Sequence, residues 1–439
     1  MVDLPYDYLE RVKRQLGASY PAFLKSYEEE RTYGLRYNPL KIEKETLRQA
    51  LSAQQITTEQ VPWAAEGLYY PADTHPGRLP LHEAGAYYIQ EPSAMVAVEL
   101  LDPQPGESVL DLCAAPGGKS TQIAGRLQGK GLLVCNEVIS KRAKALSSNI
   151  ERMGVTNAVV LNETPQRLAE RFPAFFDRIL VDAPCSGEGM FRKDVQARGE
   201  WSYAQTQLCA KRQREILAQA VQMLKPGGVL VYATCTFAPQ ENEQNAAWLV
   251  QEYPSLRLTA QEQIWPHLQR GEGHFAARFI KEGTVFAQAA AELSDRKNRG
   301  PVSEEFYQFC EQTLTAQARE RLLEGVRSGR LAAFGEQLYL LPPGIRSLDG
   351  LKTERAGLQL GCCKKRRFEP AHALAMALHP DEVSQTVELA EPERYLRGEQ
   401  IGCGTQKGWT LVTVCGCSAG WGKASAGVLK NHYPKGLRR

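Results

Sequence analysis

Apolar and polar positions alternate in blocks through the middle of the chain. Five short apolar runs have the length and composition of buried strands: SVLDLC (108–113), GLLVCNE (131–137), NAVVLN (157–162), DRILVDAP (177–184) and GGVLVYATC (227–235). Four segments between them have helical periodicity: KSTQIAGRL (119–127), SKRAKALSSNIERMG (140–154), TPQRLAERF (164–172) and KRQREILAQAVQMLKPGG (211–228). This alternation predicts an α/β fold with a doubly wound parallel sheet. Lys225-Pro226-Gly227-Gly228 is interpreted as a helix stop that leads into the last strand.

The segments on either side of this region have different patterns. Residues 1–80 are predicted to form short helices broken by RYNPL, VPW and PADTHPGRLP. The charged stretch ELSDRKNRGPVSEE (292–305) indicates a linker, and short strands and turns are predicted from about residue 375. We therefore expect four domains, with the ranges 1–80, 81–285, 286–372 and 373–439.

Composition narrows the class of protein. The chain has 439 residues, of which 43% are apolar and 23% charged, as in soluble globular proteins. It contains no signal-peptide pattern and no apolar stretch long enough to span a membrane. The 11 cysteines, an odd number with irregular spacing, favour reduced thiols in a cytoplasm. We expect a cytoplasmic monomer without an obligate protein partner.

Charge is unevenly distributed, although the net charge is only +3. The last 20 residues, GWGKASAGVLKNHYPKGLRR, carry five cations and no acid. A basic tail with interspersed aromatic residues is typical of a surface that binds a polyanion, although basic surface patches are also common without function.

The loop DLCAAPGGKS (111–120) follows the first predicted strand and opens a helix. Its glycines allow a ligand to approach the backbone closely, and the helix N-terminus offers free N–H groups. The spacing matches neither the P-loop nor the dinucleotide motif G-x-G-x-x-G, so a structural turn is the alternative. Glu137 ends the second strand, where an acid can bind a ribose diol, and Asp182 ends the fourth. These groups should converge at the carboxyl edge of the sheet.

Two cysteines lie just beyond strands at the same predicted edge. Cys185 follows the fourth strand and Cys235 follows the fifth. A reactive thiol needs a partly exposed, electropositive site, and Lys119 is a candidate cation. Cys113, Cys135 and Cys209 are expected mainly to pack in apolar surroundings. The C-terminal cysteines lack C-x-x-C spacing, so no metal site is predicted.

Three motifs of the chain resemble the motifs of a known family. In chain order, DLCAAPGGKSTQIA, VDAPCSGEGMFRKD and VYATCTFAPQENE are similar to motifs of the Nop/Sun family of RNA cytosine-5 methyltransferases, and YYIQEPSAM resembles the motif that precedes them. RFEPAHALAMAL and the tail from GWTLVTV onward resemble the C-terminal part of the bacterial RsmF type, which modifies 16S ribosomal RNA. The resemblance covers nearly the whole chain and is weakest at residues 1–80 and 285–360.

The resemblance implies a Rossmann-like S-adenosylmethionine-dependent methyltransferase domain at 81–285. It also implies an N-terminal RNA-binding module at 1–80, an intermediate domain at 286–372 and a β-rich PUA-like RNA-binding domain at 373–439. The implied cofactor-binding residues are Cys113, Ala114, Ala115, Pro116, Gly117, Gly118, Lys119, Glu137 and Asp182. The usual acid near the adenine corresponds to Thr164, so Asn162, Glu163 or the backbone is expected to substitute.

The implied activity is methylation of carbon 5 of cytosine in 16S ribosomal RNA. Carbon 5 is a weak nucleophile, and addition of a thiolate to carbon 6 activates it. Matching the motifs makes Cys235 the nucleophile and Cys185 the cysteine that promotes release. Asp182 would stabilise the charge that develops on the base, and Lys119 would bias the local electrostatics.

Candidate RNA contacts are Arg36 and Asn38 in RTYGLRYNPLK (31–41), and Lys423 and Lys430 in the basic tail. The four cations of CCKKRRFEP (362–370) bind RNA or form a solvated face.

Four other functions stay open. A DNA cytosine methyltransferase would reverse the two cysteine roles, and a cysteine hydrolase would need His267 or His274 beside a thiol. A small-molecule methyltransferase would not need paired cysteines or a basic tail. A ribosome-assembly factor without catalysis would not need the cysteines. For the methyltransferase itself, the shared motifs also allow a transfer RNA substrate.

Overall fold

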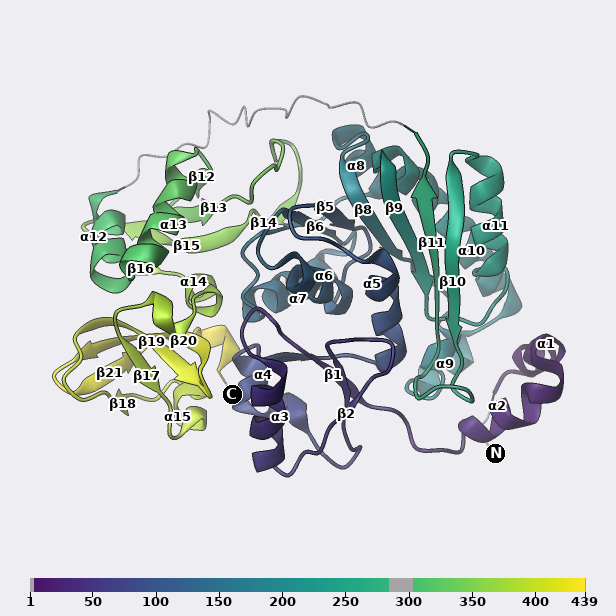
Figure 1. The fold of residues 1–439 in the computed structure, drawn as a ribbon, viewed down its shortest axis with the longest axis horizontal. Helices are drawn as coiled ribbons and strands as arrows, with labels where there is room; N and C mark the ends of the chain where they lie inside the picture. Colours follow the sequence, from purple (N-terminus) through teal and green to yellow (C-terminus); the bar gives the residue numbers. More distant parts are fainter. Residues whose placement is uncertain (1–3, 284–302, 439) are drawn as a thin grey trace.

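The computed structural model describes residues 4–283 and 303–438, and a sheet of eight strands lies at its centre (Figure 1). The strands are β5 (Ser108–Asp111), β6 (Leu132–Asn136), β7 (Ala158–Leu161), β8 (Phe176–Asp182), β9 (Leu224–Thr234), β10 (Leu256–Ile264), β11 (His274–Lys281) and β14 (Thr353–Arg355). Their order is β10-β11-β9-β8-β5-β6-β7-β14. Strands β5 to β9 are parallel and match the five predicted apolar runs, whereas β10, β11 and β14 add antiparallel edges.

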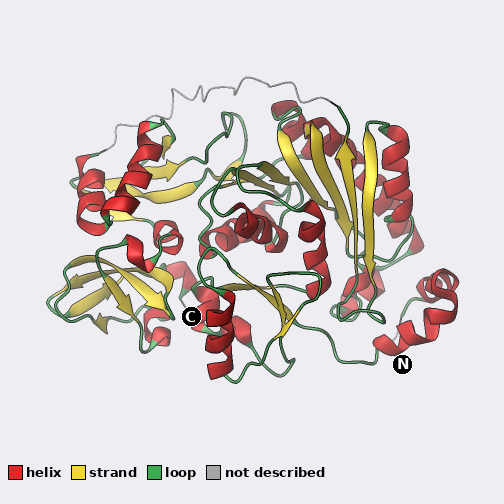
Figure 2. Ribbon diagram, viewed as in Figure 1, coloured by secondary structure: helices red, strands yellow, loops and turns green. Residues whose placement is uncertain are grey.

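Helices cover both faces of this sheet, as the alternating pattern predicts (Figure 2). They are α5 (Val96–Leu101), α6 (Gly118–Leu127), α7 (Ser140–Arg152), α8 (Pro165–Arg171), α10 (Tyr203–Met223) and α11 (Glu243–Glu252), with the short α9 (Val195–Glu200) before α10. Adjacent residues Leu133 and Val134 of β6 are buried in opposite cores, as the two-residue period of a strand requires. Every residue of β6 is buried, which explains its unbroken apolar run.

The predicted helix stop at Lys225-Pro226-Gly227-Gly228 is placed too late in the chain. Helix α10 ends at Met223, and these four residues already belong to β9. Pro226 is tolerated there because the pairing of β8 with β9 shifts register nearby, between Phe176 and Arg178. Gly227 has a φ of +77°, which suits the bulged backbone.

Residues 4–89 contain more than the short helices predicted for 1–80. The helices are α1 (Tyr6–Leu16), α2 (Tyr20–Ser26), α3 (Lys44–Ala53) and α4 (Pro80–Glu83). An antiparallel sheet of order β2-β3-β1-β4 accompanies them, formed by β1 (Gly34–Tyr37), β2 (Glu59–Gln60), β3 (Gly67–Tyr69) and β4 (Tyr87–Ile89). The helix-only prediction was wrong, because strands of two to four residues are too short to show a two-residue period.

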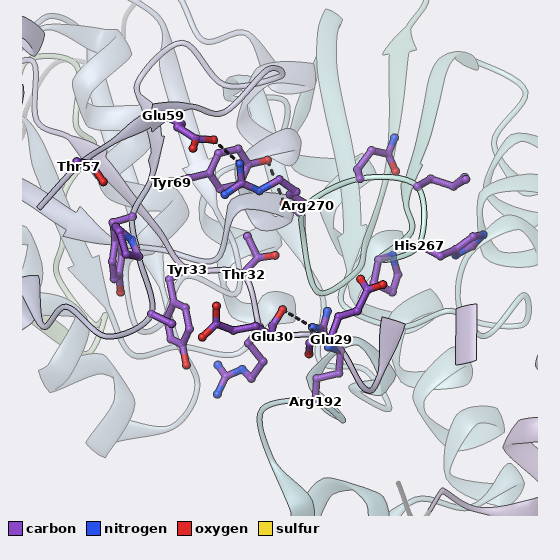
Figure 3. Close-up of a pocket in the computed structure, with 17 residues that line it drawn as sticks. Glu29, Glu30, Thr32, Tyr33, Thr57, Glu59, Tyr69, Arg192, His267 and Arg270 are labelled. Carbon is purple, nitrogen blue, oxygen red and sulfur yellow. Dashed lines mark hydrogen bonds and ion pairs between the residues drawn. The ribbon is translucent and has the colours of Figure 1, made fainter. Parts of the chain in front are cut away.

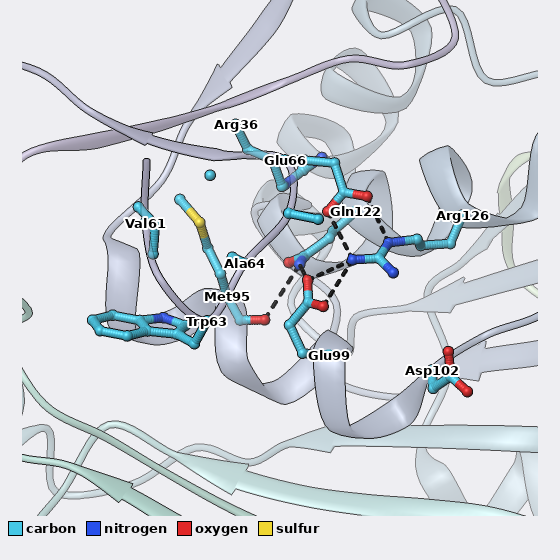
Figure 4. Close-up of polar contacts among 12 residues, drawn as sticks. Arg36, Val61, Trp63, Ala64, Glu66, Met95, Glu99, Asp102, Gln122 and Arg126 are labelled. Atoms are coloured by element: carbon cyan, nitrogen blue, oxygen red, sulfur yellow. Dashed lines mark hydrogen bonds and ion pairs between the residues drawn. The ribbon is translucent and has the colours of Figure 1, made fainter. Parts of the chain in front are cut away.

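A partly buried polar network joins this N-terminal part to the central sheet (Figure 4). Arg126 of α6 forms ion pairs with Glu66, just before β3, at 2.7 Å and with Glu99 of α5 at 2.7 Å. Gln122 of α6 donates to the Met95 carbonyl and to Glu99. Because α6 follows the predicted cofactor loop, these contacts hold that loop against the N-terminal part.

Two smaller sheets form the C-terminal part. The first has the order β12-β13-β15-β16, with β12 (Leu331–Phe334), β13 (Gln337–Leu340), β15 (Leu358–Lys364), β16 (Arg367–Pro370), α12 (Glu304–Thr313), α13 (Ala316–Arg327) and α14 (His372–Ala377). The second has the order β17-β19-β20-β21-β18, with β17 (Thr386–Glu388), β18 (Ile401–Gly402), β19 (Gly408–Val414), β20 (Cys417–Ser425), β21 (Val428–Asn431) and α15 (Pro392–Leu396).

The predicted linker 292–305 lies mostly outside the described residues. Its last residues belong to the start of α12, where the Ser303 hydroxyl caps the helix by accepting the Phe306 N–H. Strand β14 pairs with β7, so the segment 286–372 also contributes to the central sheet. The four domain ranges stay a proposal.

Candidate active site

The loop from β5 into α6 forms one wall of a cavity of about 190 Å³. Strands β5 and β8 are neighbours at the point where the strand order reverses, which is where ligands bind in such sheets. Gly117 has a φ of +113°, a conformation that L side chains rarely adopt. Seven of the predicted residues line this cavity: Cys113, Ala114, Ala115, Pro116, Gly118, Lys119 and Asp182.

Asp111 also lines the cavity, and sequence reasoning did not single it out. Its Oδ2 accepts a hydrogen bond from Ser120 at 2.6 Å, and its buried Oδ1 has no partner among the described residues. Burial raises the pKa of Asp111 to about 7. The unpaired oxygen offers an acceptor to an amine of a bound ligand. Its position at the end of an apolar strand was the available signal.

Arg36 and Asn38 are buried, so the prediction that they contact RNA was wrong. The Arg36 guanidinium donates to Gln90 Oε1 at 3.0 Å, to the Gly118 carbonyl at 2.9 Å and to Thr121 Oγ1 at 2.7 Å. Burial lowers the pKa of Arg36 to about 10. Asn38 donates to two backbone carbonyls, at 2.8 and 2.9 Å. Arg36 instead holds the start of α6 in place through the Gly118 carbonyl and the Thr121 hydroxyl.

Lys119 and Asp182 form an ion pair of 2.8 Å beside the cavity. Burial opposes the Lys119 charge, but Asp182, Cys235 and Asp111 outweigh it and raise the pKa of Lys119. The other Asp182 oxygen lies 3.8 Å from His274 Nε2. Burial and the Lys119 charge lower the pKa of His274 well below its usual value. Asp182 therefore faces one cation and one neutral imidazole.

The two predicted cysteines meet at the carboxyl ends of neighbouring strands. Cys185 follows β8, Cys235 follows β9, and their sulfurs lie 3.3 Å apart. Two further contacts join their loops: the Gly189 N–H donates to the Cys235 carbonyl at 2.8 Å, and the hydroxyls of Ser186 and Thr236 are hydrogen-bonded at 2.8 Å. The hydrogen bond to Cys235, together with burial, raises the pKa of Cys185 well above its usual value.

Glu241 lies directly behind the Cys185 turn, and sequence reasoning missed it. Its Oε2 accepts the Ser186 N–H at 3.0 Å and the Gln213 side chain at 2.8 Å. Its buried Oε1 has no hydrogen-bond partner in the described part of the chain. Burial raises the pKa of Glu241 to about 7, and its charge in turn raises the pKa of Cys185. The only sequence signal was its position six residues after Cys235.

Glu188 anchors the N-terminal helices to the cysteine loops. It is fully buried and pairs with Arg11 of α1 at 2.6 Å. It also accepts hydrogen bonds from the Trp201 indole at 2.9 Å and from the Phe237 N–H at 3.0 Å. Because Phe237 follows Cys235 by two residues, one carboxylate connects α1 to both loops.

Glu137 and Thr164 lie at the ends of β6 and β7 but do not line the cavity. The Glu137 carboxylate accepts the Ile139 N–H at 2.9 Å and pairs with Arg142 at 3.1 Å. Thr164 caps α8 by accepting the Arg167 N–H, which gives a structural reason for a hydroxyl at this position. Asn162 donates to the Glu137 carbonyl, and the Glu163 carboxylate accepts the Lys352 N–H at 2.8 Å.

Lys423 and Lys430 are exposed and lie opposite each other on β20 and β21. Lys423 also lies over the Trp409 ring, 5.3 Å from its centroid. Like charges directly opposite each other in a sheet are unfavourable unless an anion offsets them. In the hairpin at 362–370, by contrast, Lys364 and Arg367 both pair with Glu369.

The hydrolase and metal alternatives gain no support. Among the described residues, neither His267 nor His274 forms a hydrogen bond or ion pair with Cys185 or Cys235. The same residues contain no group of three or more metal-ligating side chains.

Comparison with known families identifies the class of enzyme. The profile described as 16S rRNA methyltransferase RsmB/F matches residues 98–280. Profiles for the RsmF N-terminal domain, first C-terminal domain and PUA domain match residues 4–92, 308–378 and 385–439. Ribosomal RNA small subunit methyltransferase F of Enterobacter sp. (strain 638) is 32% identical over all of this chain and 96% of its own length. The protein of the same name from Shewanella amazonensis is 32% identical, over 92% of this chain and 91% of its own length.

The chain belongs to the RsmB/F family of 16S rRNA methyltransferases. It is therefore an enzyme that has the methyltransferase fold and uses S-adenosylmethionine as its cofactor. A solved methyltransferase homolog from Pyrococcus horikoshii is 27% identical with a TM-score of 0.56, over 63% of this chain and all of its own. NSun6 of the same organism, solved with SFG, shares the fold at 22% identity and a TM-score of 0.58, over 64% of this chain and 99% of its own.

The described part of this RsmB/F methyltransferase contains no helix long and apolar enough to cross a membrane.

Proposed function

We propose that the protein methylates carbon 5 of cytosine in 16S ribosomal RNA through a covalent bond between Cys235 and carbon 6. The observation that carries this proposal is the pair of sulfurs 3.3 Å apart at the sheet edge, beside the Lys119–Asp182 ion pair. A methyl transfer that needs no activation of its acceptor would not require two adjacent thiols.

The polar groups beside the loop 113–119 suit those of S-adenosylmethionine. The N-terminus of α6 offers backbone N–H groups to a carboxylate, and the unpaired Asp111 Oδ1 can accept from an amine. Glu137 is proposed to hold the ribose hydroxyls, and Asn162 or backbone atoms the adenine. When bound, the cofactor supplies an electrophilic methyl group.

Cytosine needs activation before carbon 5 can accept that methyl group. The Cys235 thiolate adds to carbon 6, and electron density moves onto carbon 5. Asp182, which lies at the junction of the cavity and the cysteine loops, is proposed to bind the base near ring nitrogen 3. Transfer to carbon 5 then leaves a proton on that carbon, and its removal breaks the bond between carbon 6 and sulfur.

The charges around the sulfurs support Cys235 as the nucleophile. The Lys119 cation interacts with Cys235, whereas the Glu241 carboxylate raises the pKa of Cys185. The two sulfurs therefore differ: the surroundings of Cys185 keep it protonated, whereas a cation acts on Cys235. This assignment rests on local electrostatics and agrees with the assignment that the motif resemblance implies.

The same charges determine the stage of the reaction at which Cys185 acts. Its pKa is raised chiefly by the hydrogen bond to Cys235. When Cys235 bonds to carbon 6, its sulfur loses the negative charge, so Cys185 ionises more easily. Glu241, with a pKa of about 7, is suited to accept that proton. The Cys185 thiolate then takes the carbon 5 proton, and Cys235 leaves as a thiolate.

RNA binding is proposed for the C-terminal surface that carries Lys423 and Lys430. The target base must leave its stack to reach the sheet edge. The paired lysines are suited to phosphates, whereas Arg36 and Asn38 are no longer proposed as contacts.

Mapping 5-methylcytosine in 16S ribosomal RNA tests this function. Bisulfite sequencing should detect at least one methylated cytosine that disappears without the gene and returns with the wild-type chain. The Cys235→Ala chain should not restore it. Restoration by Cys235→Ala would contradict the assignment of Cys235 as the nucleophile. A map that is unchanged after deletion would contradict the function itself and favour the non-catalytic alternative.

A further inference from the structure

A second cavity, of about 480 Å³, lies between the N-terminal part and the loop joining β10 to β11 (Figure 3). Three segments form most of it: residues 29–33 before β1, residues 69–72 at the end of β3, and residues 266–270. Thr57, Glu59 and Arg192 complete the lining. Its volume is within the range of small-ligand sites. Nothing in the reaction described above uses it.

Two walls of this cavity come from segments that are close in the chain to active-site residues. Arg192 lies seven residues after Cys185, and Arg270 lies four residues before His274, which approaches Asp182. Four residues span at most roughly 14 Å, so the backbone of Arg270 lies no farther than that from the backbone of His274. Glu272 connects the walls, since it accepts the Thr32 N–H at 3.1 Å and lies 3.5 Å from Arg192.

Aromatic rings and guanidinium groups give the cavity flat surfaces. The rings of Tyr33 and Tyr70 lie 5.8 Å apart, with an angle of 44° between their planes. Arg31 lies over the Tyr33 ring at 5.2 Å, and Arg270 lies over the Tyr69 ring at 4.1 Å. Proteins bind unstacked RNA bases on such aromatic and guanidinium planes.

The polar groups of the cavity suit a neutral, hydrogen-bonding ligand. Buried Arg31 Nε and His267 Nδ1 have no hydrogen-bond partner among the described residues. Glu29 and Glu30 form no ion pair within the same residues, and Arg192 donates to the backbone carbonyl of each, at 3.0 and 2.8 Å. Three carboxylates balance three guanidiniums in the lining, which disfavours a polyanionic ligand. Carboxylates accept hydrogen bonds from exocyclic amino groups of bases.

We propose that this cavity binds an unpaired nucleotide base that neighbours the target cytosine in the RNA, and that the base carries an exocyclic amino group. The base stacks on Tyr33 or Tyr70 and donates to Glu29 or Glu30. The inference rests on the proposed function, because it needs an RNA strand that passes from the cysteines toward this cavity.

Kinetics with transcribed 16S ribosomal RNA and the full-length enzyme test the site. Tyr33→Ala should raise the KM for RNA at least about fivefold and leave kcat unchanged, because stacking contributes to binding alone. Tyr33→Phe keeps the ring and should match the wild type. Tyr307→Ala, at an exposed tyrosine on α12, is the matched control and should also match it. Unchanged KM in Tyr33→Ala and in Tyr70→Ala would overturn the inference.

Photocrosslinking of the wild-type enzyme gives a result that is independent of variant folding. RNA with photoreactive nucleosides flanking the target should crosslink to peptides containing residues 29–33 or 266–270. Crosslinks confined to other segments would overturn the inference. If the wild type does not methylate cytosine at all, the proposed function fails. Measuring RNA binding by wild type, Tyr33→Ala and Tyr70→Ala still tests the cavity in that case.

Discussion

Replacing Glu241 with glutamine should stabilise the protein above neutral pH and slow product release. Glu241 is buried and accepts two hydrogen bonds at Oε2. A glutamine keeps an accepting oxygen of the same shape but removes the negative charge. The variant thus separates the charge of this residue from its role as a hydrogen-bond acceptor behind Cys185.

The magnitude follows from the pKa of Glu241, which burial raises from an ordinary 4.5 to about 7. That difference corresponds to about 3 kcal/mol. Because the native pKa is raised, this contribution to stability is fully present below pH 4.5 and is lost as the pH rises to about 7. The wild type loses that free energy over this interval, and the glutamine variant does not.

Urea denaturation of the RNA-free enzyme measures the difference. The free energies of unfolding of wild type and Glu241→Gln should be similar near about pH 5 and differ by about 2–3 kcal/mol near about pH 8. Glu252→Gln, at an exposed position at the end of helix α11, which begins two residues after Glu241, should show no such dependence. A difference that stays constant with pH would refute the argument that Glu241 is held in an unfavourable charged state. Slower release should appear as more enzyme–RNA adduct during turnover.

Three further substitutions test individual contacts. Arg11→Ala leaves the Glu188 carboxylate buried without its ion-pair partner and should cost roughly 3–5 kcal/mol in chemical denaturation. Gly273→Ala would place a Cβ 2.2 Å from the Phe237 ring at a φ of +123°, and should lower the melting temperature and abolish methylation. Lys119→Met removes the cation that favours the Cys235 thiolate. The rate of adduct formation at neutral pH should therefore fall below that of the wild type.

Matched controls distinguish these effects from general damage. Arg14→Ala removes a cation from the same helix as Arg11 without leaving a buried carboxylate, and should change stability by less than roughly 0.5 kcal/mol. Gly199→Ala adds a Cβ into open space and should not lower the melting temperature. An Arg11→Ala loss no larger than that of Arg14→Ala would contradict the role of Glu188. A pH–rate profile of Lys119→Met that overlays the wild type would contradict the role of Lys119.

The parallel core and the cysteine pair could be predicted from the sequence because their signals are local. A strand buried on both faces is apolar at every position, and parallel strands end at one edge. Cys185 and Cys235 each follow such a strand, so the topology alone brings them together. The predictions for Glu137 and for a monomer in the cytoplasm stay predictions.

The remaining features depend on partners that are distant in the chain. Arg36 looks like a surface residue in a turn, and only carbonyl and hydroxyl groups more than 50 residues away explain its burial. The Arg11–Glu188 pair spans 177 residues, and no spacing rule connects its members. Glu241 has no local motif, because its importance lies in the desolvation that folding creates around it.

Trapping the bond between enzyme and RNA tests the central claim most directly. Wild type, Cys185→Ala and Cys235→Ala are incubated with 16S ribosomal RNA and S-adenosylmethionine, denatured, and separated by gel electrophoresis. Cys185→Ala should accumulate a denaturation-resistant adduct, because Cys235 still attacks but release is blocked, and Cys235→Ala should form none. An adduct in Cys235→Ala but not in Cys185→Ala would show that the two sulfurs have the opposite roles.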